Sequence, residues 1–198
     1  MNKREDEKPS SKYNLKWVFL ISIWTFFMAI TISIITENLV NNLDVLAAFI
    51  VLIMIILIGI IFDIIGIAVT TADEKPFHSM AANKVGEARY AIKLVRNAGQ
   101  VSNFCNDVIG DISGILSGAA GTTIIFKLIV RYPFINSTVF TILFTSLIAA
   151  FTVGGKAFGK SIALLYHEKI IYSISKMLNF LYKNFGIDIF PNKKKHKK

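Results

Sequence analysis

The sequence predicts an all-α integral membrane protein with four transmembrane helices, a cytoplasmic amphipathic helical belt and a C-terminal juxtamembrane helix. Three observations support this fold class. First, 54% of the 198 residues are hydrophobic and only 18% are charged, which is too apolar for a soluble domain that must cover its surface with polar groups. Second, several apolar stretches reach the ~20 residues that a helix needs to cross a bilayer. Third, the segments outside these stretches are alternately rich and poor in Lys and Arg along the chain.

Four stretches have the length and hydropathy of a membrane span. They are residues 17–35, 45–71, 106–130 and 137–153, within a transmembrane domain of residues 17–158. The first stretch is uncharged and is not followed by a cleavage site of small residues, so we interpret it as a span and not as a signal peptide. The fourth is expected to end at the Gly154–Gly155 pair.

The distribution of Lys and Arg predicts the orientation of the spans. Five basic residues lie in residues 1–16, none in 36–44, five in 72–103, two in 127–136 and ten in 156–198. Because cytoplasmic segments of membrane proteins carry an excess of Lys and Arg, both termini are expected in the cytoplasm. This pattern is typical of a multi-pass protein of the cell (plasma) membrane.

The segments on the predicted cytoplasmic side are amphipathic. Residues 72–103 place apolar and basic residues at helical spacing, which predicts one or two short helices at the membrane surface. Residues 159–186 repeat this pattern and predict a juxtamembrane helix. The tails are residues 1–16 and 187–198, and the second is strongly basic. The net charge of +9 therefore indicates attraction to anionic membrane lipid and not to nucleic acid.

Three aspartates lie inside the apolar spans: Asp63, Asp107 and Asp111. A carboxylate in hydrocarbon costs roughly 2.5–3.5 kcal/mol even on the insertion scale, so a cation, a partner charge, water or a proton must offset it. Asp107 and Asp111 are four residues apart and share a helix face, with Asn106 and Ser113 nearby. Asp107 equally fits a solvated position near a helix N-terminus. Oxygen ligands of this kind suit Mg²⁺, so we expect these five residues to form a metal site.

A second pattern in the third span is Gly110, Gly114 and Gly118, spaced four residues apart. Small residues at this spacing allow the backbones of two membrane helices to approach closely. The stripe favours ordinary helix packing and is compatible with a dimer interface around a pathway. Lys127, near the other end of this span, is expected to extend its ammonium group to the membrane surface.

Three sequence stretches occur in a characteristic order. They are FDIIGIAVTTAD at 62–73, ANKVGEARYAIKLVRNAGQVSNFCNDVIGD at 82–111 and GGKAFGKSIALLYHEKII at 154–171. Through these stretches, residues 62–185 resemble the transmembrane domain of the CorC/CNNM (cyclin M) family of magnesium transporters. That family is built of membrane helices around a cytoplasm-open acidic cavity.

Individual residues carry the resemblance. Asn106 and Asp107 stand in the Gly-Asn-Asn helix start of the family, and its Gly-Glu-x-x-Pro-Lys-Ser-Leu-Ala motif matches Gly155, Lys160 and Ser161. The resemblance implies a homodimer that receives Mg²⁺, with Asn106 and Asp107 as ligands and Asp63 near them. Asp111 and Ser113 are added from helix geometry.

The chain departs from the family at two acidic positions. Gly66 and Lys156 stand where the family has Glu. The first span is also additional to the usual family core. Family members commonly continue into nucleotide-binding CBS modules. This sequence ends before them, so we expect no ATP-linked regulation within the chain, and any such control would come from a separate regulatory partner protein.

Two functions follow from these observations. The first is a divalent-cation (Mg²⁺) transporter or a transporter-like membrane protein with an ion site inside the membrane. The alternative is a degenerate, non-transporting membrane protein that modulates a partner or binds anionic lipid, and the carboxylates lost at Gly66 and Lys156 favour it. An enzyme is not expected, because the sequence contains no catalytic or phosphate-loop motif.

Overall fold

The computed structural model describes residues 15–134 and 136–186, with side chains from residue 19 onward. The basic tail at 187–198 and residues 1–14 of the predicted N-terminal tail lie outside the described residues. Within the described part of the chain, all regular structure is helical, and four helical segments are long and apolar enough to cross a membrane. The prediction of an all-α protein with four such helices is confirmed.

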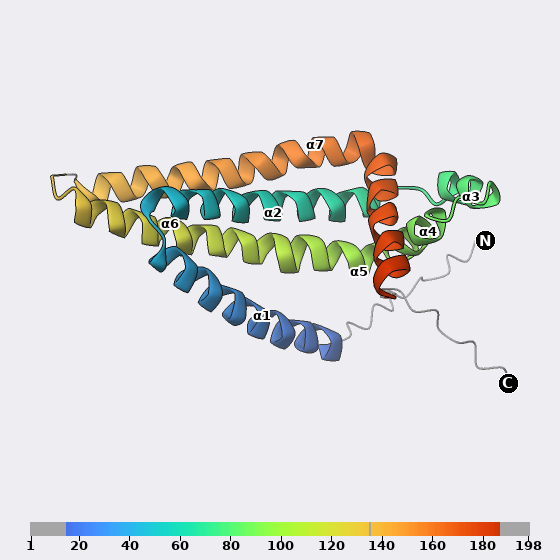
Figure 1. Ribbon diagram of the computed structural model, residues 1–198, viewed down its shortest axis with the longest axis horizontal. Helices are drawn as coiled ribbons and strands as arrows, with labels where there is room; N and C mark the ends of the chain where they lie inside the picture. Colours follow the sequence, from blue (N-terminus) through green and yellow to red (C-terminus); the bar gives the residue numbers. More distant parts are fainter. Residues whose placement is uncertain (1–14, 135, 187–198) are drawn as a thin grey trace, which may run out of the picture.

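The first two long helices form an antiparallel pair that opens toward one end (Figure 1). Helix α1 covers Leu15–Asn42 and α2 covers Val45–Thr71. The bounds of α2 are those predicted, whereas α1 does not stop at residue 35. Its polar last turns stay helical because their amides donate back to the backbone, from Asn38 Nδ2 to the Ile34 carbonyl (2.9 Å) and from Asn42 Nδ2 to the Asn38 carbonyl (2.8 Å).

Three short helices follow α2 and mark what we call the α3–α4 end of the bundle (Figure 1). They are α3 (Lys75–Ala82), α4 (Ala88–Arg96) and α5 (Ala98–Ser102). The third long segment is continuous from α5 through a π-helix, η1 (Asn103–Gly110), into α6 (Asp111–Arg131). It therefore begins eight residues before the predicted start at residue 106.

The last helix, α7, covers Ser137–Phe185. The helix continues past residue 153, where the fourth span was expected to end: Gly154 and Gly155 stay helical, and Gly155 packs directly on Ile60 of α2. The helix instead bends sharply at Tyr166, whose φ and ψ are −121° and 21° (Figure 1). His167 Nδ1 lies 2.9 Å from the Leu164 carbonyl, so a side chain competes for a helix acceptor at the bend.

The segment after the bend crosses the end of the bundle and packs on the short helices (Figure 1). Its apolar face contributes Ile171 and Leu178 to a buried cluster, with Ile174 packed against it. The other buried members come from α2, α3 and α4: Val69, Phe77, Tyr90, Ala91 and Leu94. This apolar face is therefore covered by protein, whereas Leu165, just before the bend, and Met177, after it, are exposed.

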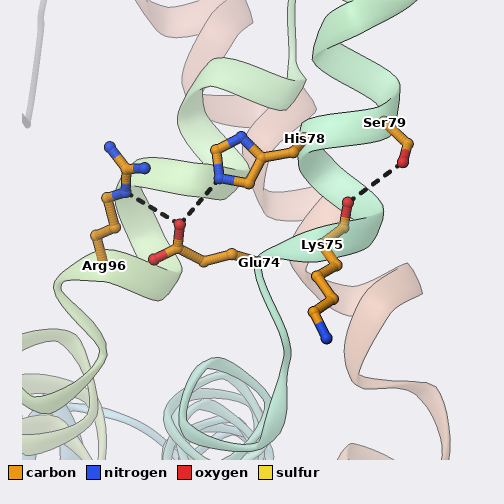
Figure 2. A network of polar contacts seen from close by, with 5 residues as sticks. All are labelled: Glu74, Lys75, His78, Ser79 and Arg96. Carbon is orange, nitrogen blue, oxygen red and sulfur yellow. Dashed lines mark hydrogen bonds and ion pairs between the residues drawn. The ribbon is translucent and has the colours of Figure 1, made fainter.

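Polar contacts tie α3 to α4 near this cluster (Figure 2). Arg96 Nε donates to Glu74 Oε2 at 3.1 Å, and His78 Nε2 lies 3.1 Å from the same oxygen. The hydrogen bonds from His78 and Arg96, in that order, hold the pKa of Glu74 below its ordinary value. The Glu74 carboxylate thus connects the start of α3 to the end of α4.

Candidate functional site

The centre of the candidate site is an ion pair between two long helices. Lys156 Nζ of α7 lies 3.6 Å from Asp111 Oδ1, at the first residue of α6. The Lys156 side chain is 25% exposed, and that of Asp111 is 69% exposed. Lys156 precedes the bend at Tyr166 by ten residues, or about 15 Å along the axis. The pair therefore lies well within the length of the apolar helices.

Gly110 provides the space in which Asp63 joins this pair. A Cβ built on Gly110 would lie 3.4 Å from Lys156 Nζ and 3.7 Å from Asp63 Oδ1. The ammonium group and the α2 carboxylate therefore face the same small residue. Gly110, which the sequence suggested for helix packing, lies beside the charged cluster.

Five charged groups gather around this point. The charges that act on the Asp63 carboxylate are those of Lys156, Asp111, Lys160 and Asp107. The structure thus brings the three predicted aspartates into one neighbourhood, but with two lysines among them. The five formal charges add to −1, so most of the acidic charge is neutralised by the chain itself.

Asn106 reaches the edge of the cluster from the π-helix. Its Nδ2 donates to Ser102 Oγ at 3.2 Å, while its Oδ1 is buried and accepts no hydrogen bond from the described residues. The Asn106 amide lies directly against Gly66, where an added Cβ would overlap Oδ1. Gly66 therefore makes room for Asn106, and the wide turns of the π-helix, a feature frequent at functional sites, present this amide to α2.

Ser113 and the remaining glycines lie apart from the charged cluster. Ser113 is buried against Gly59 of α2, where an added Cβ would be 2.9 Å from Ser113 Cβ. It is two residues from Asp111 and therefore points to the other side of α6. Gly114 and Gly118 meet no atom of the described chain within 4 Å of an added Cβ. Close packing inside the chain uses other glycines, namely Gly59, Gly66, Gly121, Gly155 and Gly159.

The arrangement is an open cluster of charges and not a closed cage for a metal ion. Among the described residues, no group of three or more His, Cys, Asp or Glu side chains is placed to hold a metal. Asp63 and Asp111 offer carboxylate ligands beside the Lys156 ammonium, and the free Asn106 oxygen lies against Gly66, about one turn along α2 from Asp63. The sequence located the aspartates and singled out Lys156, but the role of Lys160 as a nearby charge required the structure.

Comparisons with known proteins identify no relative of this chain. No protein-family model, curated protein or solved structure matches this chain. The fold and the site therefore define a class only: within the described residues, a helical bundle with four membrane-length apolar helices and a charge cluster between three of them.

Proposed function

We propose that the chain is a multi-pass membrane protein that transports a divalent cation, Mg²⁺ in the first instance, with Lys156 as a tethered cation in the ion site. The observation that carries this proposal is the Lys156–Asp111 ion pair facing Gly110 beside Asp63. Ionisable groups at membrane depth are expensive and mark ion pathways and proton relays. The resemblance to CorC/CNNM magnesium transporters supports Mg²⁺ as the substrate.

The mechanism follows from competition for the carboxylates. A partly hydrated Mg²⁺ takes one or two carboxylates and keeps several of its waters. Asp63 and Asp111 supply those carboxylates, the free Oδ1 of Asn106 supplies a neutral ligand, and Asp107 adds negative charge at the α3–α4 end. The flexible stem of Lys156 lets its ammonium group withdraw when the ion enters. When the ion leaves, the ammonium returns and restores the balance of charge.

The exposed face of α6 supports a homodimer. Asp107, Asp111 and Gly118 are exposed on this face, and a Cβ added at Gly114 would meet no other atom of the described chain within 4 Å. A second copy packed on the small residues would cover carboxylates that otherwise face lipid. We further propose a plasma-membrane location with both termini cytoplasmic, contacts between basic segments and anionic lipid, and regulation through a separate partner protein.

A second candidate function is a non-transporting membrane protein that modulates a partner or organises anionic lipid. The observation that favours it is the same lysine, because a permanently paired Lys156 leaves no site for a free cation. In this case the charge cluster would only hold α2, α6 and α7 together.

Mg²⁺ flux into proteoliposomes that contain the purified full chain separates the two candidates. Transport predicts flux with the wild-type chain, its loss in Asp63→Asn plus Asp111→Asn and in Asp107→Asn plus Asp111→Asn, and no change in Asp44→Asn. Asp44 is a matched control, because it is exposed in the turn between α1 and α2. Absence of flux from both the wild type and Lys156→Gln would overturn transport and leave the second candidate.

A further inference from the structure

A cavity with a mixed lining, mostly apolar by area, lies between α1 and α6 at the end of the bundle opposite α3 and α4. Two of its polar side chains, Glu37 and Thr122, are exposed. Its volume is about 340 Å³. An acid and four hydroxyl side chains line it, and an apolar floor completes it. The polar side chains are Ser33, Thr36, Glu37, Thr122 and Thr123. So many oxygen atoms between two membrane-length helices call for an occupant that can use them.

The hydroxyl groups on α6 present acceptors to this cavity. Thr122 Oγ1 donates to the Gly118 carbonyl at 3.0 Å, and Thr123 Oγ1 donates to the Ala119 carbonyl at 3.2 Å. A hydroxyl has one proton and two lone pairs. Because each proton is already given to the helix backbone, the oxygen atoms that remain can only accept. An ionised Glu37 is likewise an acceptor only, so the lining suits a cation.

The nearest basic residue on α6 does not neutralise Glu37. The ammonium group of Lys127 donates to the carbonyls of Val40, Asn41 and Leu43, at 2.6, 3.0 and 2.7 Å. These three bonds use all the protons of the group. Among the described residues, Glu37 has no ion-pair partner. Its carboxylate thus remains available to a ligand.

We propose that this cavity is a second cation site, which takes a hydrated divalent cation through Glu37 and the hydroxyl oxygens of α1 and α6. Its volume exceeds the roughly 180 Å³ that six water molecules occupy in the liquid, so the ion can keep an inner water shell, as Mg²⁺ does. Thr122 is eleven residues from Asp111, or about 16 Å along α6. The two sites are therefore separate, and the second stands whether or not the chain transports ions.

Binding of Mn²⁺, measured by electron paramagnetic resonance on the purified full chain in lipid nanodiscs, tests this site. We expect Glu37→Gln to lose one class of bound Mn²⁺. Thr122→Val plus Thr123→Val, which removes two oxygen ligands at nearly constant shape, should lose the same class. Glu168→Gln is the matched control, because Glu168 is an exposed glutamate beyond the bend of α7. This variant should bind Mn²⁺ as the wild type does.

The outcomes are distinct from those of the transport experiment. Asp63→Asn plus Asp111→Asn should leave the Glu37-dependent class of Mn²⁺ in place, and helical content by circular dichroism identifies any variant that fails to fold. Wild-type Mn²⁺ binding by Glu37→Gln, or by the folded threonine double variant, would overturn the second site. Absence of Mg²⁺ flux from both the wild type and Lys156→Gln, with this class of bound Mn²⁺ present, would count against the transport proposal alone.

Discussion

Lys156 and Asp111 form an ion pair of 3.6 Å between the middle of α7 and the start of α6. The Lys156 ammonium group thus contacts the carboxylate of Asp111 and faces Gly110 together with the carboxylate of Asp63. A lysine in this position competes with any free cation for the same carboxylate. In the proposed transport function, the affinity for Mg²⁺ therefore depends on the lysine as well as on the aspartates.

The first prediction concerns this competition. Lys156→Gln should strengthen Mg²⁺ binding roughly ten- to hundredfold, because removing one unit charge at this range changes the energy of a bound cation by about 1–3 kcal/mol. The measurement is the rise in unfolding temperature with added Mg²⁺, since a ligand that binds only the folded state stabilises it. Lys169→Gln, an exposed lysine beyond the bend, should respond as the wild type does. An equal response in Lys156→Gln would show that the lysine does not compete.

The second prediction uses the contact between Gly66 and Asn106. Gly66→Ala should destabilise the folded chain by about 1–3 kcal/mol, as overpacking does, because the new Cβ would overlap Asn106 Oδ1. Gly99→Ala and Gly154→Ala are matched controls at exposed helical positions where an added Cβ meets no other atom, and there alanine favours the helix by up to about 1 kcal/mol. Unfolding in a mild detergent with added denaturant measures the difference. A similar stability for all three variants would mean that Asn106 moves aside freely.

Sequence patterns located α2 well and α7 poorly, for physical reasons. The run from Val45 to Thr71 is apolar and is bounded by polar residues, so its ends are encoded locally. The glycine pair at 154–155 suggested a break, yet both residues are helical, and Gly155 packs on Ile60 of α2. The real bend at Tyr166 has no glycine or proline, and it depends on the docking of the following segment onto α4.

The site was predicted only in part, because spacing within one helix can be read from the sequence whereas contacts between helices cannot. Helix periodicity predicted that Asp107 and Asp111 share a face, and the family resemblance predicted that Asp63 of α2 lies near Asp107. The charges of Asp107 and Asp111 both act on the Asp63 carboxylate. The partner of Lys156 could not be predicted from spacing, since α6 and α7 meet only through the tertiary fold. The π-helix likewise has no local sequence signal, although it sets the direction of Asn106.

The third prediction concerns Lys127, whose ammonium group caps the end of α1. It does not simply extend to the surface, because it donates to three carbonyls of the turn between α1 and α2. Hydrogen bonds that involve a charged group are worth about 1.5–3 kcal/mol each, so Lys127→Met should lower the free energy of unfolding by a comparable amount and loosen α1. Faster proteolysis in the α1–α2 turn would reveal the loosening. Arg131→Met, one turn further along and exposed, should cleave at the wild-type rate.

The final prediction concerns pH and the Glu74 carboxylate at the α3–α4 end. Its pKa is lower in the folded protein than in the unfolded chain, because His78 and Arg96 bond to the charged form. A group with a lowered pKa contributes its full stabilisation above its unfolded pKa, about 4.3 for glutamate, and loses it as the pH falls through the folded value. Acidification should therefore weaken the attachment of α3 to α4. The unfolding temperature of Glu74→Gln should depend less on pH than that of the wild type as the pH falls below the unfolded pKa. Thermal unfolding between pH 3 and 6, with Asp73→Asn as the neighbouring control, measures this slope, and an unchanged slope in Glu74→Gln would place the acid-sensitive group elsewhere.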